Sequence, residues 1–180
     1  METPRTSKTL LLLRHAKSAW DQDVADHERA LSGRGRRDAV AAGQLLVARG
    51  WLPDVVACST ARRTRETWDR AVTGGAKAAE VRYLDAIYEA RVTDLARVVR
   101  SMPETAQTVL LIGHGPGVPD LVDFLASRTP ESATSWARLD HKYPTAGLAV
   151  LTIPGSWGEA GESRAELVAF EVPRGPAKSP

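Results

Sequence analysis

Residues Thr9–Ser18 read TLLLLRHAKS, and the rest of the chain is best understood from this stretch. Thr9–Leu13 is an apolar run with the length of one buried strand. The run stops at Arg14 and His15, a cation that can hold a phosphate and a side chain that can attack one. Ligands of open α/β sheets bind beyond the carboxyl ends of the parallel strands. The pair therefore lies where a substrate is expected, although many ordinary strands also end in polar residues.

A second stretch downstream has the same design. Thr108–Gly117 reads TVLLIGHGPG, so that a short apolar run leads into His114 among glycines and a proline. Glycines allow the backbone to approach a ligand closely. Two strands that each deliver a histidine to a loop indicate a shared site rather than two unrelated structural residues.

Strand and helix patterns alternate along the rest of the chain. Apolar runs predict further strands at Val55–Ser59, Val81–Leu84, Leu148–Ile153 and Leu167–Val172, the last two forming a hairpin at the sheet edge. A helix is predicted from the Ser32 cap to Arg49, with Gly50 as its C-terminal glycine. Further helices are predicted after a Ser59 or Thr60 cap, over Val92–Ser101 and over Pro119–Ser127. Residues 16–30 lack either period and are expected to form a loop over the sheet. This alternation predicts an α/β three-layer sandwich with a mainly parallel central sheet flanked by helices.

The size and composition fit one globular domain. The chain has 180 residues, of which 43% are hydrophobic and 26% charged. We expect the domain to span residues 9–173, between a disordered arm of residues 1–8 and a disordered tail of residues 174–180. No apolar run is long enough to cross a membrane, and the first eight residues lack the apolar core of a signal peptide. The sequence therefore predicts a cytoplasmic protein without a membrane partner.

Several other functional classes are disfavoured. The net charge is only +2, and the arginines are spread without interleaved aromatic residues, so no nucleic-acid partner is expected. The single cysteine, Cys58, lies in a strand-like run and is expected to act as a small core residue. No spacing of Asp or His residues suits a metal ion, and we expect neither a metal nor another cofactor. The sequence leaves the oligomeric state open.

A cluster of arginines follows the Val55–Ser59 strand. The segment STARRTRETW places Arg62, Arg63 and Arg65 in the first turns of a predicted helix. Cations there oppose the helix dipole, which indicates an anionic ligand, with a solvated basic face as the alternative. Phosphoryl transfer needs an in-line nucleophile and positive donors around the phosphoryl oxygens. Arg14, His15, His114 and one of these arginines would supply that set.

At these residues the chain resembles the histidine phosphatase superfamily, and within it the SixA-like phosphohistidine phosphatase branch. The motifs that carry the resemblance are RHAKS followed by Asp26, Arg29, Leu31 and Gly35, then STARRTRET, IYEA at Ile87, GHGPG at Gly113 and YPTAGLAVL at Tyr143. Ala16 stands where the first motif of the superfamily has a glycine, and it agrees with the RHAKS of the SixA-like branch. The chain departs from the usual motifs at Thr60, where a proline is typical, and at Gly115, where an asparagine is typical. The resemblance implies a phosphoglycerate mutase-like fold.

The resemblance also implies roles for individual residues. His15 corresponds to the nucleophile, Arg14 and Arg63 to the phosphate clamp, and His114 to the second histidine of the phosphate pocket. The substrate-binding set it implies is Arg14, Ser18, Arg63, His114 and Gly115. Glu89 lies in the region where many members carry a general acid, and at this point it is open whether it acts as the acid or is an ordinary surface residue.

The activity implied is that of a hydrolase, a metal-independent phosphatase with a covalent phosphohistidine intermediate. By the same resemblance its substrate would be protein phosphohistidine, for example on a histidine phosphotransfer domain. The chain has no large insertion that could close over a small molecule, and this favours a protein substrate. Two alternatives stay open: a phosphomonoesterase of the same superfamily that acts on a small phosphate ester, and a non-catalytic phosphate-binding adaptor.

Overall fold

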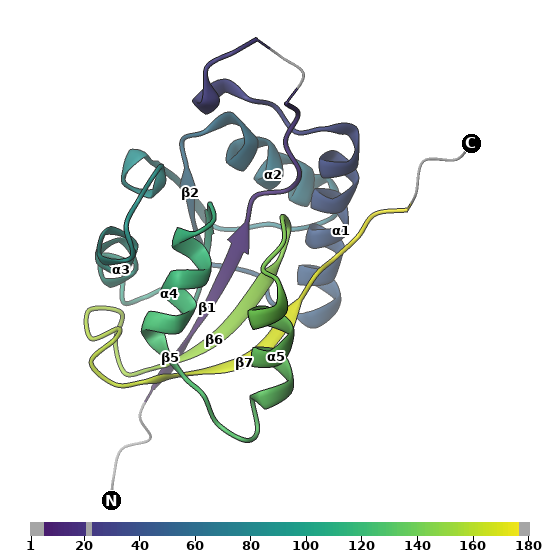
Figure 1. Cartoon of the computed structure of the whole chain (residues 1–180). Coiled ribbons are helices and arrows are strands. Elements are labelled where there is room, and N and C mark those ends of the chain that lie inside the picture. The colour runs from purple at the N-terminus through teal and green to yellow at the C-terminus, as the bar shows by residue number, and fades with distance from the viewer. Residues whose placement is uncertain (1–5, 21–22, 177–180) are drawn as a thin grey trace, which may run out of the picture.

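One mixed seven-stranded sheet forms the centre of the computed structural model, which describes residues 6–20 and 23–176 (Figure 1). The strands are β1 (Ser7–Arg14), β2 (Val55–Ser59), β3 (Glu80–Leu84), β4 (Thr108–Gly113), β5 (Ala126–Ser127), β6 (Leu148–Pro154) and β7 (Ala165–Glu171). Their order is β3-β2-β4-β1-β6-β7-β5. The pairs along β3-β2-β4-β1 and the β7-β5 pair are parallel, whereas β6 is antiparallel to both β1 and β7. The mainly parallel sheet predicted from the sequence is confirmed.

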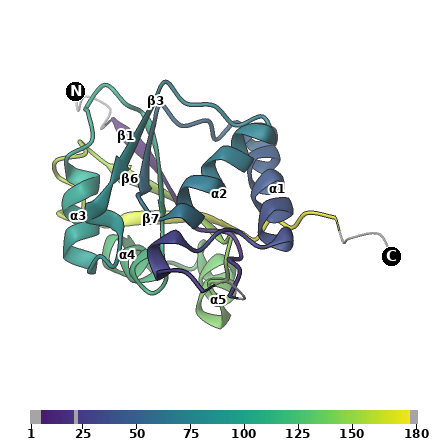
Figure 2. The ribbon, with the colours of Figure 1, turned by 90° about the horizontal axis from the view of Figure 1, so that it is seen from above.

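Helices cover both faces of this sheet (Figures 1 and 2). On one face lie α1 (Gly33–Arg49) and α2 (Arg62–Thr73), whose buried side chains pack with the sheet in one core cluster. On the other lie α3 (Val92–Arg100), α4 (Gly117–Leu125) and α5 (Ala133–His141), which contribute to a second cluster. Short 3-10 helices occupy Asp26–Glu28 and Asp85–Ile87. The arrangement is the predicted three-layer α/β sandwich.

The leucine run of β1 serves both cores. Leu10 and Leu12 pack in the cluster that includes α3 and α4, and Leu11 and Leu13 pack in the cluster that includes α2. All four side chains are at most 1% exposed. Because both faces of this central strand are covered, its sequence is continuously apolar instead of alternating. Burial of each leucine stabilises the fold by roughly 1.5–3 kcal/mol, which fixes the strand that leads into Arg14 and His15.

The ends of α1 follow the predicted capping signals. Ser32 Oγ accepts a 3.0 Å hydrogen bond from the Gly35 amide, and Gly50 ends the helix in the left-handed region with φ 68°. The predicted cap of α2 is wrong, since Ala61 precedes the helix and no side chain caps it. The two hydroxyls are engaged elsewhere: Thr60 donates to Asp85 Oδ1 at 2.6 Å, and Ser59 Oγ lies 2.8 Å from His114 Nε2.

The late part of the chain differs most from the prediction. The helix expected over Pro119–Ser127 ends at Leu125, and Ala126–Ser127 pairs with β7 instead. The β6-β7 hairpin is confirmed, but β5 and not β7 takes the outer place in the sheet. Helix α5 was not expected from the sequence, although its buried Trp136 and Leu139 stand three positions apart, as an amphipathic helix requires.

Some residues of the predicted N-terminal arm and C-terminal tail make ordered contacts with the domain. Strand β1 starts at Ser7, two residues before the predicted start, and Lys8 donates to the Ala106 carbonyl at 3.1 Å. At the other end Arg174 lies 3.5 Å from the Asp38 carboxylate, which also accepts from the Gly175 amide at 3.0 Å. The remainder of the predicted arm and tail, residues 1–5 and 177–180, is outside the described residues.

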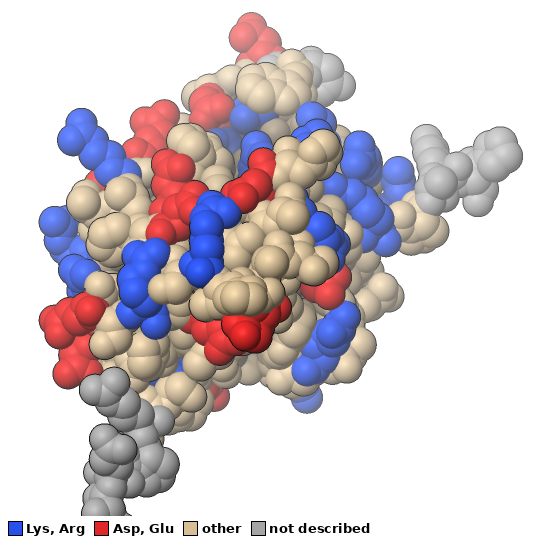
Figure 3. Space-filling model, turned by 60° about the horizontal axis from the view of Figure 1, so that its bottom comes forward, with Lys and Arg blue, Asp and Glu red and all other residues tan. Residues whose placement is uncertain are grey.

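The surface carries charges of both signs. On the face in Figure 3, Lys and Arg side chains are interspersed with Asp and Glu side chains, in keeping with totals of 24 basic and 22 acidic residues. Within the described ranges, no helix combines the length and apolar character needed to cross a membrane.

Candidate active site

The two predicted histidines meet at the carboxyl ends of neighbouring parallel strands. His15 directly follows β1 and His114 directly follows β4, and these strands pair in parallel register up to Arg14 and Gly113. The His15 amide continues this ladder by donating to the Gly113 carbonyl at 2.9 Å. The imidazole centroids lie 5.3 Å apart with an interplanar angle of 56°. The sheet therefore builds one site from residues that are far apart in the sequence.

His15 is held as a neutral ring with one defined tautomer. Its Nδ1 lies 2.7 Å from the Ala16 carbonyl, and because a carbonyl oxygen only accepts, Nδ1 bears the proton. Burial lowers the pKa of His15 to about 3, and the charges of Arg63 and Arg14 act in the same direction. The ring is therefore uncharged near neutral pH. Its Nε2 keeps the lone pair that a nucleophile needs.

His114 is tied through its opposite nitrogen. Its Nε2 lies 2.8 Å from Ser59 Oγ, at the end of β2. Burial and the nearby Arg63 charge lower the pKa of His114 to about 4, so this ring is also neutral at pH 7. Its Nδ1 is buried and has no hydrogen-bond partner among the described residues.

Arg14 lies against the loop that carries His114. Its Nη1 donates to the Tyr143 carbonyl at 2.8 Å, while its Nε is buried without a partner in the described part of the chain. A Cβ atom at Gly115 would stand only 3.2 Å from Arg14 Cζ. Gly115 thus allows the loop after β4 to pack on the Arg14 guanidinium. An asparagine at position 115 would place its Cβ in tight contact with Arg14.

Arg63 is the arginine of the α2 cluster that reaches the site. It is 5% exposed, and its Nη1 and Nη2 donate to the Asp26 carbonyl at 2.7 Å and to Asp26 Oδ2 at 3.1 Å. Its Nε is buried and unpaired within the described residues. The other two arginines make surface contacts, Arg62 with Glu66 at 2.7 Å and Arg65 with the Thr60 carbonyl at 3.0 Å. The helix pattern alone left these three arginines as alternatives, whereas the family resemblance pointed to Arg63.

Asp26 holds Arg63 in place and is itself held by two further side chains. Its Oδ2 accepts from the Tyr88 hydroxyl at 2.7 Å, and its Oδ1 accepts from Arg29 Nε at 3.0 Å. The Tyr88 hydrogen bond, together with the charge of Arg63 and the bond from Arg29, lowers the pKa of Asp26 to about 2. Asp26 is therefore a carboxylate at neutral pH and cannot serve as a proton donor.

Ser18 lies behind this network. It is 4% exposed, and its hydroxyl accepts from Arg29 Nη1 at 2.8 Å. It lines a separate cavity with Trp20 and Leu31, and not the cavity that His114 lines. The structure thus brings together Arg14, His15, Arg63 and His114 but places Ser18 where it supports Arg29, at one remove from the site.

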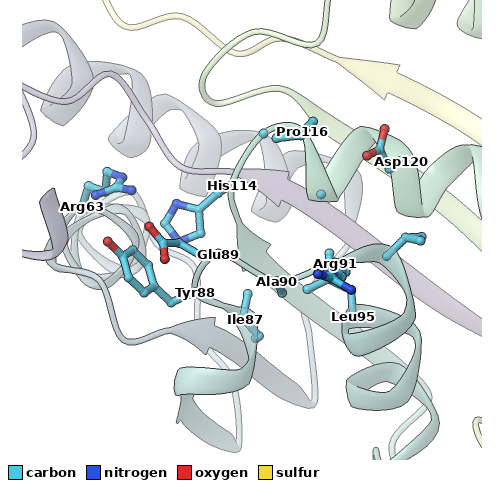
Figure 4. Close-up of a pocket in the computed structure, with 13 residues that line it drawn as sticks. Arg63, Ile87, Tyr88, Glu89, Ala90, Arg91, Leu95, His114, Pro116 and Asp120 are labelled. Atoms are coloured by element: carbon cyan, nitrogen blue, oxygen red, sulfur yellow. The ribbon is translucent and has the colours of Figure 1, made fainter.

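A cavity of about 630 Å³ adjoins the site (Figure 4). Its lining includes Arg63, Tyr88, His114 and Gly115 from the site, continues over the start of α3 and α4, and also includes Glu89. In Figure 4 the Glu89 carboxylate lies on the side of the cavity that His114 and Tyr88 occupy. Glu89 has φ 51°, a left-handed conformation that costs a non-glycine residue about 1–2 kcal/mol. Strained backbone conformations of this kind are concentrated at functional sites.

Sequence reasoning placed none of Asp26, Ser59 and Tyr88 in the site, although all three lie in or beside the quoted motifs. The same is true of the YPTAG segment. There the Ala146 amide donates to the carbonyls of Arg14 and His15 at 3.0 and 3.1 Å. The motifs marked these residues, but only the folded chain reveals which partner each one holds.

Known proteins identify the family. A model of the histidine phosphatase superfamily (branch 1) matches residues 10–112. The chain belongs to the histidine phosphatase superfamily. An uncharacterized protein of Mycobacterium tuberculosis, Rv1276c, is 39% identical over 162 residues, which make up 90% of this chain and 100% of that protein.

Solved structures agree with the SixA-like assignment. The structure of a proposed phosphohistidine phosphatase SixA from Nakamurella multipartitia is 35% identical, with a TM-score of 0.79 over 95% of this chain and 99% of that one. A second proposed SixA, from Agrobacterium tumefaciens, is 28% identical and has a TM-score of 0.73. The match covers 92% of this chain and 98% of that one. This histidine phosphatase is thus SixA-like in sequence motifs and in fold. Its family and its neighbours together support a phosphatase function.

Proposed function

We propose that this histidine phosphatase is a metal-independent hydrolase that passes through a phosphohistidine on His15. One observation carries the proposal: Arg14 Nε, Arg63 Nε and His114 Nδ1 are buried without partners in the described residues, and their side chains surround a neutral imidazole. Leaving a buried donor unpaired costs about 1–3 kcal/mol each. The oxygens of a phosphoryl group would accept from all three, with the phosphorus facing the free nitrogen of His15.

The chemistry follows from this arrangement. The lone pair of His15 Nε2 attacks phosphorus, an N–P bond forms, and the bond to the leaving group breaks with its electron pair on the leaving atom. The ring gains positive charge, which the Ala16 carbonyl stabilises through Nδ1–H. Arg14, Arg63 and His114 stabilise the phosphoryl oxygens. Water then attacks phosphorus, the N–P bond breaks, and inorganic phosphate leaves neutral His15 behind.

Glu89 is the candidate proton donor in the first step. It lines the cavity that a leaving group would occupy, beside His114. An alkoxide leaving group requires a proton, whereas the imidazole released from a phosphohistidine is a much better leaving group. The role of Glu89 is therefore expected to depend on the substrate.

Protein phosphohistidine is the substrate class we propose, with a histidine phosphotransfer domain as an example. The likeness to two proposed phosphohistidine phosphatases supports it. The test compares phosphate release from a histidine-phosphorylated carrier protein with release from sugar, nucleotide and glycerate phosphates, each with and without EDTA. We expect the phosphoprotein to be preferred and EDTA to have no effect.

Three results would each overturn part of the proposal. High turnover of one small ester with none of the phosphoprotein would identify a small-molecule phosphomonoesterase. Tight binding of inorganic phosphate without hydrolysis of any substrate would identify a phosphate-binding adaptor. Loss of activity in EDTA that returns with an added divalent cation would contradict metal independence.

A further inference from the structure

Ser59 is completely buried at the end of β2, directly beside the second histidine. The residue is 0% exposed, and its Oγ lies 2.8 Å from His114 Nε2. The same oxygen accepts a 3.3 Å hydrogen bond from the Ala61 amide at the start of α2. Serine and histidine are 55 residues apart in the sequence, and the parallel β2-β4 pairing brings them together.

Counting the available protons decides whether Ser59 or His114 is the donor in the Ser59–His114 hydrogen bond. The Ala61 amide can only donate, so it leaves the Ser59 hydroxyl proton unassigned. Among the described residues, His114 Nε2 is the one acceptor within hydrogen-bond distance of that hydroxyl. With the ring proton on Nδ1, only Nδ1–H lacks a partner among the described residues. With the ring proton on Nε2, both the Ser59 hydroxyl proton and the Nδ1 lone pair would be unpaired at buried positions, and each buried group without a partner costs about 1–3 kcal/mol. The hydroxyl therefore donates to Nε2.

We propose that Ser59 is a positioning residue that fixes the tautomer of His114, so that Nδ1–H donates to the phosphoryl group. A neutral imidazole has one N–H, and with Nε2 accepting from Ser59 that proton must be on Nδ1. Nδ1 is the buried nitrogen that has no partner in the described part of the chain. The serine thus turns a ring that could present either a lone pair or an N–H into a donor beside Arg14 and Arg63. The phosphoryl target rests on the proposed function, whereas the tautomer does not.

The tautomer can be measured without substrate. The full chain, labelled with 15N in its histidines, would be examined at neutral pH by two-bond 1H–15N correlation spectroscopy, with His114→Gln identifying the His114 signals. We expect protonated Nδ1 and unprotonated Nε2 in the wild-type protein. In Ser59→Ala this pattern should be lost, with the proton moving partly or wholly to Nε2. Ser59→Thr, which keeps a hydroxyl, should restore the wild-type pattern.

Thr64→Val is the matched control. Thr64 is 0% exposed, and its hydroxyl donates to the Ser59 and Ala61 carbonyls at 2.8 and 2.7 Å without touching His114. The variant removes a buried hydroxyl from the same strand-helix junction, so it should leave the His114 signals unchanged. A wild-type spectrum with the proton on Nε2, or an unchanged spectrum in folded Ser59→Ala, would overturn the proposal. The wild-type spectrum decides even if Ser59→Ala does not fold.

Kinetics then separate this inference from the proposed function. Ser59→Ala should weaken the His114 donor and so lower kcat/KM for phosphate release by about tenfold. This is a smaller loss than complete removal of a charge-stabilising donor would cause. The inhibition constant of inorganic phosphate should rise with it, and Thr64→Val should change neither. If the tautomer depends on Ser59 but the wild-type chain hydrolyses no phosphate compound, the proposed function fails and the tautomer assignment stands.

Discussion

The ends of β1 and β4 present the same residue type in opposite ways. Each strand is a buried apolar run that ends at a histidine, both rings are neutral, and their centroids are 5.3 Å apart. His15 is tied through Nδ1 to a backbone carbonyl, which leaves the lone pair of Nε2. His114 is tied through Nε2 to the Ser59 hydroxyl, which leaves Nδ1. In our account the first ring is the nucleophile and the second a donor.

This difference teaches that a histidine's role is set by the group that occupies its other nitrogen. A carbonyl oxygen accepts and forces the ring proton toward itself, whereas a hydroxyl can supply its own proton. Burial removes the charged form of both rings and so makes the tautomer decisive.

Replacing each histidine in turn is the strongest test of the different roles of His15 and His114. His15→Ala should lose phosphate release by about a thousandfold or more, because the chemical step itself is removed. His114→Ala should lose about a hundredfold, because one donor of several is removed. His141→Ala, at an exposed position at the end of α5, is the control and should keep the wild-type rate. Phosphate release under saturating substrate measures all three, and equal losses at His15 and His114 would contradict the division of roles.

The charge of Arg63, like that of Arg14, lowers the pKa of both histidines, and replacing Arg63 tests this common part of the site. Arg63→Ala should cost about 2–4 kcal/mol of transition-state stabilisation, seen as a fall in kcat/KM, since a buried charged donor is lost. Arg62→Ala and Arg65→Ala change neighbouring arginines that make surface contacts, and should stay within a few-fold of wild type. A larger loss in either control than in Arg63→Ala would move the phosphate clamp to that residue.

Glu89 lines the same cavity as His114, and its replacement tests whether this side of the site supplies a proton donor. Glu89→Gln should slow hydrolysis of an alkyl phosphate about tenfold or more, because the alkoxide then departs without its proton donor. Hydrolysis of phosphohistidine should change little, since imidazole leaves more readily. The ratio of kcat values for the two substrates is the measurement, and an equal change for both would assign Glu89 to the fold or to general binding.

The pH dependence of stability tests the buried state of His15 without any substrate. His15 has a pKa of about 3 in the folded chain against an ordinary value of 6.5, so the unfolded chain binds its proton at higher pH. Stability should therefore fall as the pH drops from about 6.5 toward 3. His15→Ala lacks this contribution and should show a shallower fall over the same window. Urea unfolding of both proteins across this range provides the measurement, and parallel curves would contradict the buried neutral state of His15.

The fold was largely predictable because its signals are local. The leucine run of β1, the Ser32 cap and Gly50 each act within a few residues, and all three were placed correctly. Helix α5 was missed because its two buried residues form only a short apolar pattern.

The residues of the site could be named from the sequence motifs, but their contacts could not. Both histidines follow strands, but the Ser59 contact of His114 spans 55 residues and the Asp26 contact of Arg63 spans 37. Three arginines stand in one helical segment, and it was the family motif, not the helical periodicity, that pointed to Arg63. The contacts of Arg63 and His114 depend on how α2 packs on the sheet and on where residues 23–30 place Asp26.

The most direct test of the account is to trap the enzyme during turnover. The wild-type chain would be mixed with a histidine-phosphorylated carrier protein labelled with 32P, quenched rapidly, and separated from the carrier. We expect label on the chain that is labile in acid and stable in base, located at His15 and absent in His15→Ala. Hydrolysis without any labelled chain would mean direct attack by water. Label that persists in His15→Ala would mean another nucleophile, and either result would contradict the role assigned to the end of β1.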